Sequence, residues 1–351
     1  MGGRPDAGET ERAATASQTA LSGADRPGPH TDDESLGRVP DFFVVGHQKC
    51  GTTALYYMLR DHPQIFLSEY KEPRYFAPEL RPPLQHETPD RPQTLAGYLA
   101  LFADAGAGQL IGDTSPQYIR SPTAAARIAA LRPSARIIAI LREPVSYLRS
   151  YHMEMVINHV EPEKDFRKAI ELEPERRRAA AADGSFLPPQ FLYSEHVRYV
   201  EQLRRFEDEF PREQMHLIVY DDFRRDNDGT VRAVQRFLGV DDTVPLQPVQ
   251  TSPNEAVRSL RLHKLRGAVG AADAGAGSAG MLARTLSAIT PRRLRSGVLA
   301  GVVRRLAYAP PAPVDQAFER ELRRRFKGEV VALSEYLDRD LVELWGYERL
   351  D

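Results

Sequence analysis

A lysine and two threonines lie in a short loop that two glycines frame, and the loop follows the apolar run 42–45. A helix that begins at Thr52 offers a phosphate unpaired N–H groups and a partial positive charge. The loop resembles G-x-x-x-x-G-K-[ST], but Thr52 stands where that pattern has its lysine, and the lysine is Lys49 instead. The loop therefore predicts a phosphate site. The plain alternative is a glycine turn that only connects a strand to a helix.

A second candidate phosphate site follows the apolar run 137–141. Arg142 ends this run and carries a planar fork of donors that suits phosphate. Pro144 fits the first turn of a helix, and Ser150 lies about two turns further along it, on a face that could meet the same phosphate. Taken alone, Arg142 and Ser150 could be a surface pair. Beside the first loop, they favour a phosphate.

Apolar runs and helical patterns alternate along the chain, which predicts an α/β fold with a central parallel sheet flanked by helices. The strand-like runs are 42–45, 65–67, 110–111, 137–141 and 217–220. The helical patterns are about 54–59, 94–104, 122–132, 144–158, 194–209, 229–238 and 315–345. Because ligands of such sheets bind at the carboxyl ends of the strands, we expect Lys49, Asp113 and Arg142 to face one crevice.

Three segments together resemble the sulfotransferases that use 3′-phosphoadenosine 5′-phosphosulfate (PAPS). Gly46–Thr53 is similar to the 5′-phosphosulfate loop of that family, and Ile137–Ser150 is similar to its 3′-phosphate motif. His62–Ile65 followed by Lys71–Phe76 resembles a segment of the carbohydrate-type branch. The resemblance covers about 41–345, and the abundance of arginine and alanine is typical of a GC-rich bacterial genome.

The resemblance implies a sulfotransferase fold like that of the phosphate-loop NTPases, with PAPS as the donor and no metal. In it, Lys49 neutralises charge on the leaving phosphate and Glu72 is the general base. The residues implied in donor binding are Lys49, Cys50, Gly51, Thr52, Thr53, Arg142 and Ser150.

Three further residues are candidate acceptor contacts: Lys71, Asp113 and Tyr193. Lys71 and Glu72 are adjacent, so on a strand they would point to opposite faces and only one would face the donor. Asp113 is either a second carboxylate of the site or a helix cap, and Tyr193 either borders the acceptor cleft or packs in the core. We expect His47 to point away from the loop mouth and Cys50 to be a small loop residue, not a nucleophile.

Composition excludes several classes of protein. The 351 residues carry 47 basic and 49 acidic side chains, which argues against a protein that coats nucleic acid. One cysteine excludes an intramolecular disulfide and a zinc site built from several cysteines. The chain has no apolar stretch of membrane-spanning length and no apolar signal-peptide core, so we expect a cytoplasmic protein.

The predicted domain is 39–351, preceded by a disordered tail at 1–38 that has no aromatic residue. Within the domain, 267–310 is a flexible insertion or lid rich in glycine, alanine and arginine. Its part 281–309 has six arginines and no acidic residue. It is therefore a helix over the active site, a peripheral contact with an anionic membrane surface, or a solvated helix face.

The predicted function is transfer of a sulfuryl group from PAPS to a hydroxyl, or an amine, of a glycan, a glycolipid or a specialised metabolite. The acceptor is thus a small molecule, a lipid-linked molecule or a glycan, with residues from 73–93, 159–190 and 246–300 in loops beside it. Two alternatives stay open: a phosphate-loop kinase or NTPase, and a non-catalytic nucleotide-binding protein of a membrane surface. The sequence carries no prediction of oligomeric state.

Overall fold

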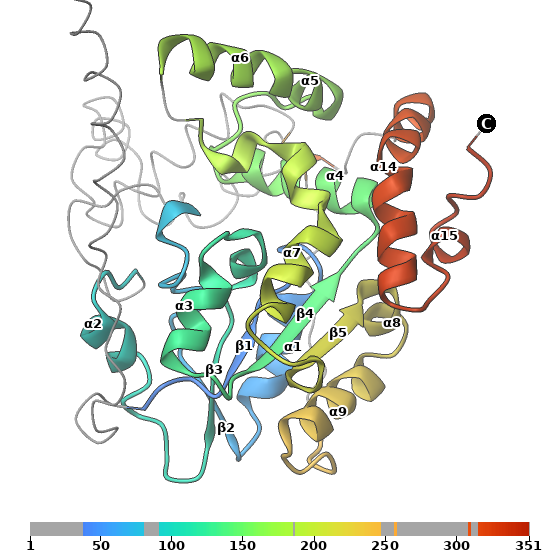
Figure 1. Ribbon diagram of the computed structural model, residues 1–351. Helices are drawn as coiled ribbons and strands as arrows, with labels where there is room; N and C mark the ends of the chain where they lie inside the picture. Colours follow the sequence, from blue (N-terminus) through green and yellow to red (C-terminus); the bar gives the residue numbers. More distant parts are fainter. Residues whose placement is uncertain are drawn as a thin grey trace, which may run out of the picture. The chain divides into compact units, whose positions relative to one another are not determined.

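The computed structural model divides the chain into two units, 1–36 and 37–351 (Figure 1). The structure describes residues 38–80, 91–184, 187–246, 256–257, 308–309 and 315–350. The predicted tail, apart from Arg38, and almost all of the predicted insertion lie outside the described residues. Arg38 is tied to the domain, because its guanidinium donates to the carbonyl oxygens of Gly106 and Gln109 at 2.8 and 2.5 Å.

Five parallel strands form the central sheet, which confirms the predicted architecture. The strands are β1 (Phe42–Val44), β2 (Ile65–Leu67), β3 (Leu110–Asp113), β4 (Arg136–Leu141) and β5 (Met215–Val219). Their order across the sheet is β2-β3-β1-β4-β5. In register, Phe43 of β1 pairs with Asp113 on one side and with Ile137 on the other. The chain leaves β1 in one direction and later returns to its other side, so the carboxyl end of β1 is a topological switch point.

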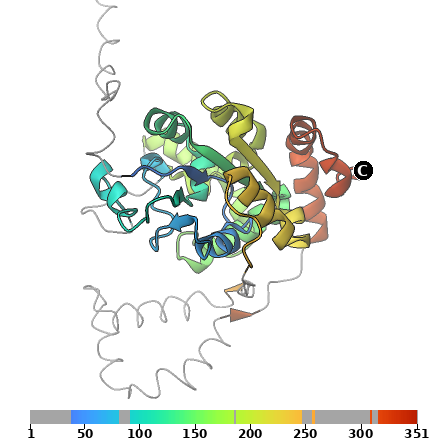
Figure 2. The ribbon, with the colours of Figure 1, turned by 90° about the horizontal axis from the view of Figure 1, so that it is seen from below.

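Helices cover both faces of the sheet, which is why the central strands are continuous apolar runs. Figure 2 shows α1 (Thr52–Arg60) and α9 (Asn227–Leu238) below the sheet and α3 (Ala124–Leu131) and α7 (Tyr199–Glu207) above it. The side chains of β1 are 0% exposed, so the sheet lies at the centre of the core.

Several predicted boundaries were wrong, each for a local reason. The helix predicted at 194–209 is a 3₁₀ segment, Tyr193–Val197, followed by α7, because Arg198 between them has a non-helical ψ of 62°. The helix predicted at 94–104 is only α2 (Leu95–Ala100). Strand β5 ends before Tyr220, which begins the helix α8 (Tyr220–Arg225).

The stretch 159–190, predicted as a loop, contains two helices: α5 (Phe166–Glu171) and α6 (Glu173–Asp183). Asp165 caps α5, because its carboxylate accepts a hydrogen bond from the N–H of Lys168 at 3.0 Å. In Figure 1 both helices lie on the side of the sheet to which the carboxyl ends of the strands point. The region predicted to border the acceptor is therefore built in part from regular structure.

The C-terminal helix α14 (Gln316–Tyr336) packs against α4 (Pro144–Ile157) and α7, and the short α15 (Leu341–Leu344) follows it. Trp345 is buried, and its indole N–H donates to Asp221 at 2.9 Å. No helix among the described residues is long and apolar enough to cross a membrane. A two-stranded antiparallel pair, β6 (Ala256–Val257) with β7 (Tyr308–Ala309), completes the described elements.

Candidate active site

Two glycines fix the path of the loop between β1 and α1. A Cβ on Gly46 would stand 2.3 Å from the backbone nitrogen of Ile140, so the loop passes directly against β4. Gly51 has a φ of 90°, and a Cβ there would stand 2.8 Å from the ring of Phe223. Only glycine fits at either position, so packing and backbone conformation together explain why the loop is framed by these residues.

The loop presents unpaired groups that suit an anion. Lys49 has a left-handed φ of 60°, and its carbonyl oxygen accepts a hydrogen bond from Arg142 at 2.8 Å. Within the described part of the chain, the Lys49 ammonium group makes no hydrogen bond or ion pair. Gly51 precedes α1 and provides no side-chain cap, so the first N–H groups of the helix are left to a ligand.

Lys71 joins this loop to the predicted general base. Its ammonium group donates to the Thr53 hydroxyl at 2.7 Å and to Glu72 at 3.2 Å. The expectation that Lys71 and Glu72 point to opposite faces was wrong. The segment is not a strand, and the φ of 59° at Glu72 turns the chain so that both side chains meet.

Glu72 lies between two cations. Lys71 contacts one carboxylate oxygen, and Arg74 contacts the other at 2.8 Å. Burial raises the pKa of Glu72, but Lys71 and Arg74 outweigh it and hold this pKa below its ordinary value of 4.5. Glu72 is therefore ionised at neutral pH and able to accept a proton.

Asp113 supports this arrangement from the core and does not face the crevice as predicted. It is 1% exposed, and its carboxylate accepts hydrogen bonds from the hydroxyls of Tyr98, Ser115 and Tyr118 at 2.7–2.9 Å. The Ser115 hydroxyl in turn accepts from the backbone N–H of Arg74 at 3.1 Å. Asp113 thus positions the turn that carries Glu72; it caps no helix, since the 3₁₀ segment Pro116–Arg120 has no side-chain cap bond.

Asp113 gives the fold a distinct pH dependence. Burial raises its pKa from 3.8 to about 6, although the three hydroxyl donors lower it in part. The native state therefore holds this proton to higher pH than the unfolded state does, and stability falls as pH rises from about 4 to 6, by about 3 kcal/mol. We expect Asp113→Asn to lose this fall, measured as the free energy of urea unfolding at several pH values. The exposed control Asp104→Asn should keep it; equal slopes in all three proteins would contradict the assignment.

Arg142 presents its guanidinium beside the loop. Its Nε and Nη2 donate to the Ser146 hydroxyl at 3.0 and 2.7 Å, and its plane lies over the ring of Tyr220 at 4.7 Å. Ser150 is one turn further along α4 and buried, so it shares a face with Ser146. Ser146 was not predicted as a site residue. The signal for it was its position four residues after Arg142 and four before Ser150, which places it on the same face of α4 as Ser150.

Glu154 continues the same face of α4 and was also missed. It follows Ser150 by four residues, as Ser150 follows Ser146. Its Oε2 is buried and has no hydrogen-bond partner in the described residues. Burial holds the pKa of Glu154 above its ordinary value, and the charge of Glu72 adds to this rise. The positive charges of Lys49, Lys71 and Arg74 lower this pKa only in part, so the charges of the predicted centre act on this carboxyl.

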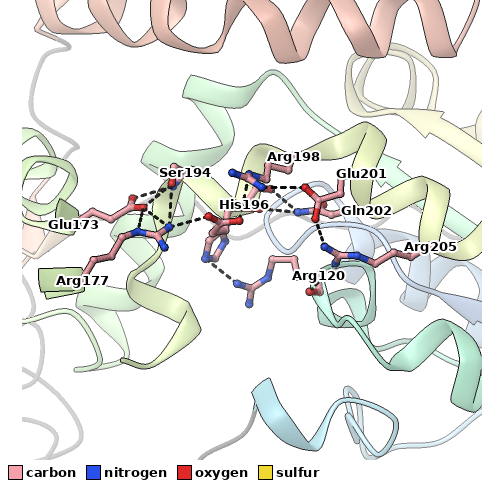
Figure 3. Close-up of polar contacts among 10 residues, drawn as sticks. Arg120, Glu173, Arg177, Ser194, His196, Arg198, Glu201, Gln202 and Arg205 are labelled. Atoms are coloured by element: carbon pink, nitrogen blue, oxygen red, sulfur yellow. Dashed lines mark hydrogen bonds and ion pairs between the residues drawn. The ribbon is translucent and has the colours of Figure 1, made fainter. Parts of the chain in front are cut away.

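His47 and Cys50 are not chemical groups of the site. His47 points into the core, where its Nε2 pairs with Gln202 at 2.9 Å, and burial lowers its pKa to about 3. Figure 3 shows Gln202 within a polar network behind the loop, in which Arg120 donates to His196 at 2.7 Å. Burial raises the pKa of the Cys50 thiol to about 12, so it stays protonated.

Tyr193 packs in the core, where its ring is stacked against that of His196 at 6.4 Å between centroids. Tyr193 is 1% exposed, and its hydroxyl donates to the Glu161 carboxylate at 2.9 Å. Glu161 also forms an ion pair with Arg176 of α6. This placement matches the core-packing alternative for Tyr193. Among the described residues, no three histidine, cysteine or acidic side chains are grouped as metal ligands.

Comparisons with known proteins agree on one family. The family model described as a sulfotransferase domain matches residues 39–268. Heparan sulfate glucosamine 3-O-sulfotransferase 3A1 of Mus musculus is 28% identical over 209 residues, which are 59% of this chain and 48% of that protein. The membrane-associated sulfotransferase kil1 of Dictyostelium discoideum is 32% identical over 118 residues, 33% of this chain and 23% of that protein.

A solved structure is similar over more of its length. The sulfotransferase from Alicyclobacillus acidocaldarius has a TM-score of 0.53 and 28% identity, and the match covers 66% of this chain and 91% of that chain. The chain spans less than half of the length of the two curated relatives, so their printed activities describe those proteins.

Proposed function

Because the chain belongs to the sulfotransferase domain family, we propose that it transfers a sulfuryl group from PAPS to a hydroxyl, or an amine, of its acceptor. The observation that carries the proposal is the loop before α1. In this loop the Lys49 ammonium group has no partner among the described residues, and the helix N-terminus that follows has no side-chain cap. Arg142 donates a hydrogen bond to the carbonyl oxygen of Lys49 and so lies beside both. Two groups suited to phosphate thus meet at the switch point of the sheet.

The residues present fit the two phosphate groups of the donor. The N–H groups of residues 50–53 and the hydroxyls of Thr52 and Thr53 would hold the 5′-phosphate, with Lys49 beside its sulfuryl end. Arg142, Ser146 and Ser150 would hold the 3′-phosphate. The left-handed conformation of Lys49 and Gly51 supports the first assignment, because it turns the loop toward α1.

The donor supplies a sulfuryl group whose sulfur–oxygen bond to phosphate breaks as a bond from sulfur to the acceptor oxygen forms. Lys49 would stabilise the negative charge that grows on the leaving phosphate oxygen. Glu72 would take the proton that the acceptor hydroxyl loses. Arg74 and Lys71 hold the Glu72 carboxylate from both sides, so the base is oriented before the acceptor binds.

The acceptor class is proposed as a small molecule, a lipid-linked molecule or a glycan. Residues 112–118 resemble a segment of the family in which some carbohydrate enzymes have a lysine where Thr114 stands, and the threonine weakens the case for a strongly anionic glycan. A phosphate-loop kinase is the second candidate, since Asp113 follows a strand as a magnesium-binding aspartate does. Its burial under three hydroxyl donors gives this alternative little support.

Calorimetric titration with 3′-phosphoadenosine 5′-phosphate, beside ATP with and without magnesium, tests the proposal. We expect the first ligand to bind without magnesium and more tightly than ATP. Arg142→Ala should weaken this binding about 100-fold, because it removes a charge-assisted fork from a phosphate.

Arg142 also holds the Lys49 carbonyl, so a control must separate ligand contact from loop structure. Arg142→Lys keeps the charge without the fork and should bind at an intermediate affinity. Arg178→Ala, at an exposed position of α6, should bind as the wild type does. A preference for ATP that requires magnesium would instead establish the kinase alternative.

A further inference from the structure

One carboxyl group of the site has no partner within the described residues. Oε2 of Glu154 is buried and accepts no hydrogen bond there, and no ion pair reaches the residue. The cations that act on its carboxyl are Lys49, Lys71 and Arg74, and Glu72 is the carboxylate that acts on it. Glu154 therefore lies within reach of the charges around the predicted base, on the face of α4 that carries Ser146 and Ser150.

Two of these three cations already have a partner. Lys71 and Arg74 each contact Glu72 directly, at 3.2 and 2.8 Å. Among the described residues the Lys49 ammonium group makes no hydrogen bond or ion pair, and the proposed function assigns it to the donor. A buried acceptor oxygen without a donor is costly, and native proteins rarely leave one in that state. Because no described residue supplies this donor, Oε2 of Glu154 is available to a donor on a molecule that enters the site.

We propose that Glu154 selects the acceptor by receiving a hydrogen bond from a hydroxyl or ammonium group beside the group that is sulfated. This inference rests on the proposed function, and it narrows the acceptor to a neutral or cationic polyol, such as an amino sugar. An anionic substituent at the same place would meet the negative charges of Glu154 and Glu72, while Lys71 and Arg74 are already paired with Glu72 and Lys49 is assigned to the donor. Repulsion would then reject carboxylated or sulfated acceptors.

Glu154 is a specificity residue in this scheme and not a second base. Lys71 and Arg74 hold the carboxylate of Glu72, which stays ionised. Neither of these two cations forms an ion pair with the Glu154 carboxyl. Its position on α4, one turn beyond Ser150, fixes it relative to the donor site, because both belong to one rigid helix. The proposal therefore predicts a change in acceptor preference without loss of donor binding.

Three 4-nitrophenyl glycosides test this inference: the glucoside, and the glucosaminide and glucuronide, each of which differs from the glucoside at one substituent. Each is titrated by saturation-transfer NMR against the complex of the protein with 3′-phosphoadenosine 5′-phosphate. We expect the wild type to bind the glucosaminide at least about tenfold more tightly than the glucuronide. Glu154→Gln should reduce this ratio to about twofold, and Glu154→Asp, which keeps the charge, should preserve it.

The controls distinguish a structural effect from a change of specificity. Glu175→Gln removes the same charge from an exposed position of α6 and should leave the ratio unchanged. Glu154→Met is the second neutral variant, and it should also lose the preference while still binding 3′-phosphoadenosine 5′-phosphate. Equal ratios in the wild type and both neutral variants, or a wild type without preference, would overturn the inference. A wild type that does not bind 3′-phosphoadenosine 5′-phosphate would overturn the proposed function instead, and the inference with it.

Discussion

Replacing Lys49 by alanine is expected to lower kcat by about 10³-fold, because a preorganised cation at the leaving oxygen acts mainly in the transition state. The side chain makes no hydrogen bond or ion pair in the described part of the chain, so its loss should change the free energy of unfolding by only about 0.5 kcal/mol. Activity is measured as transfer of the radiolabelled sulfuryl group from PAPS to an acceptor that the wild type sulfates.

The backbone of Lys49 supplies a second comparison. Its left-handed φ of 60° is unfavourable for a residue with a side chain, whereas glycine adopts it freely. Lys49→Gly should therefore be more stable than Lys49→Ala by about 1 kcal/mol and equally inactive. Lys164→Ala, at an exposed lysine, should keep wild-type activity. If Lys49→Ala retained more than about a tenth of the wild-type kcat, charge stabilisation by Lys49 would not be the main catalytic contribution.

The sequence predicted the sheet because its central strands are apolar on both faces. Residues 42–45 and 137–141 have no polar alternation, and the structure buries both within the core. The sequence did not predict the order of the strands in the sheet, because a local apolar pattern does not indicate which strand lies beside β1. The helices α5 and α6 were missed because α6 is rich in arginine and exposed alanine, so it shows little apolar periodicity.

The sequence indicated Arg142 because it follows β4 directly, and Lys49 because it lies in the glycine-framed loop after β1. The sequence did not indicate the turn that carries Glu72, because the left-handed residues of that turn are not glycines. Arg74, with a φ of 56°, is held by Ser115 from the segment after β3, and that contact joins residues 41 positions apart. Glu154 was missed for another reason: a glutamate in a helix usually faces water, and only the packing around α4 shows that its Oε2 is buried.

Replacing Glu72 by glutamine is expected to lower kcat by about 10²- to 10⁴-fold, the range for loss of a positioned general base. The amide is isosteric and removes the proton acceptor while leaving the turn in place. Glu69→Gln, three residues earlier and exposed, is the matched control and should be as active as the wild type. The same transfer assay measures all three proteins.

The pH dependence of kcat/KM separates a base from a residue that only positions the acceptor. Because Lys71 and Arg74 hold the pKa of Glu72 below 4.5, the wild-type rate should fall on the acid side only below that pH. Arg74→Ala removes one of these cations, so the pKa of Glu72 rises and the acid limb should move to higher pH. An acid limb that stays in place in Arg74→Ala, together with an active Glu72→Gln protein, would assign proton transfer to another group. Glu154 is then the first residue to test, because the charges of Lys49, Lys71 and Arg74 act on its carboxyl too.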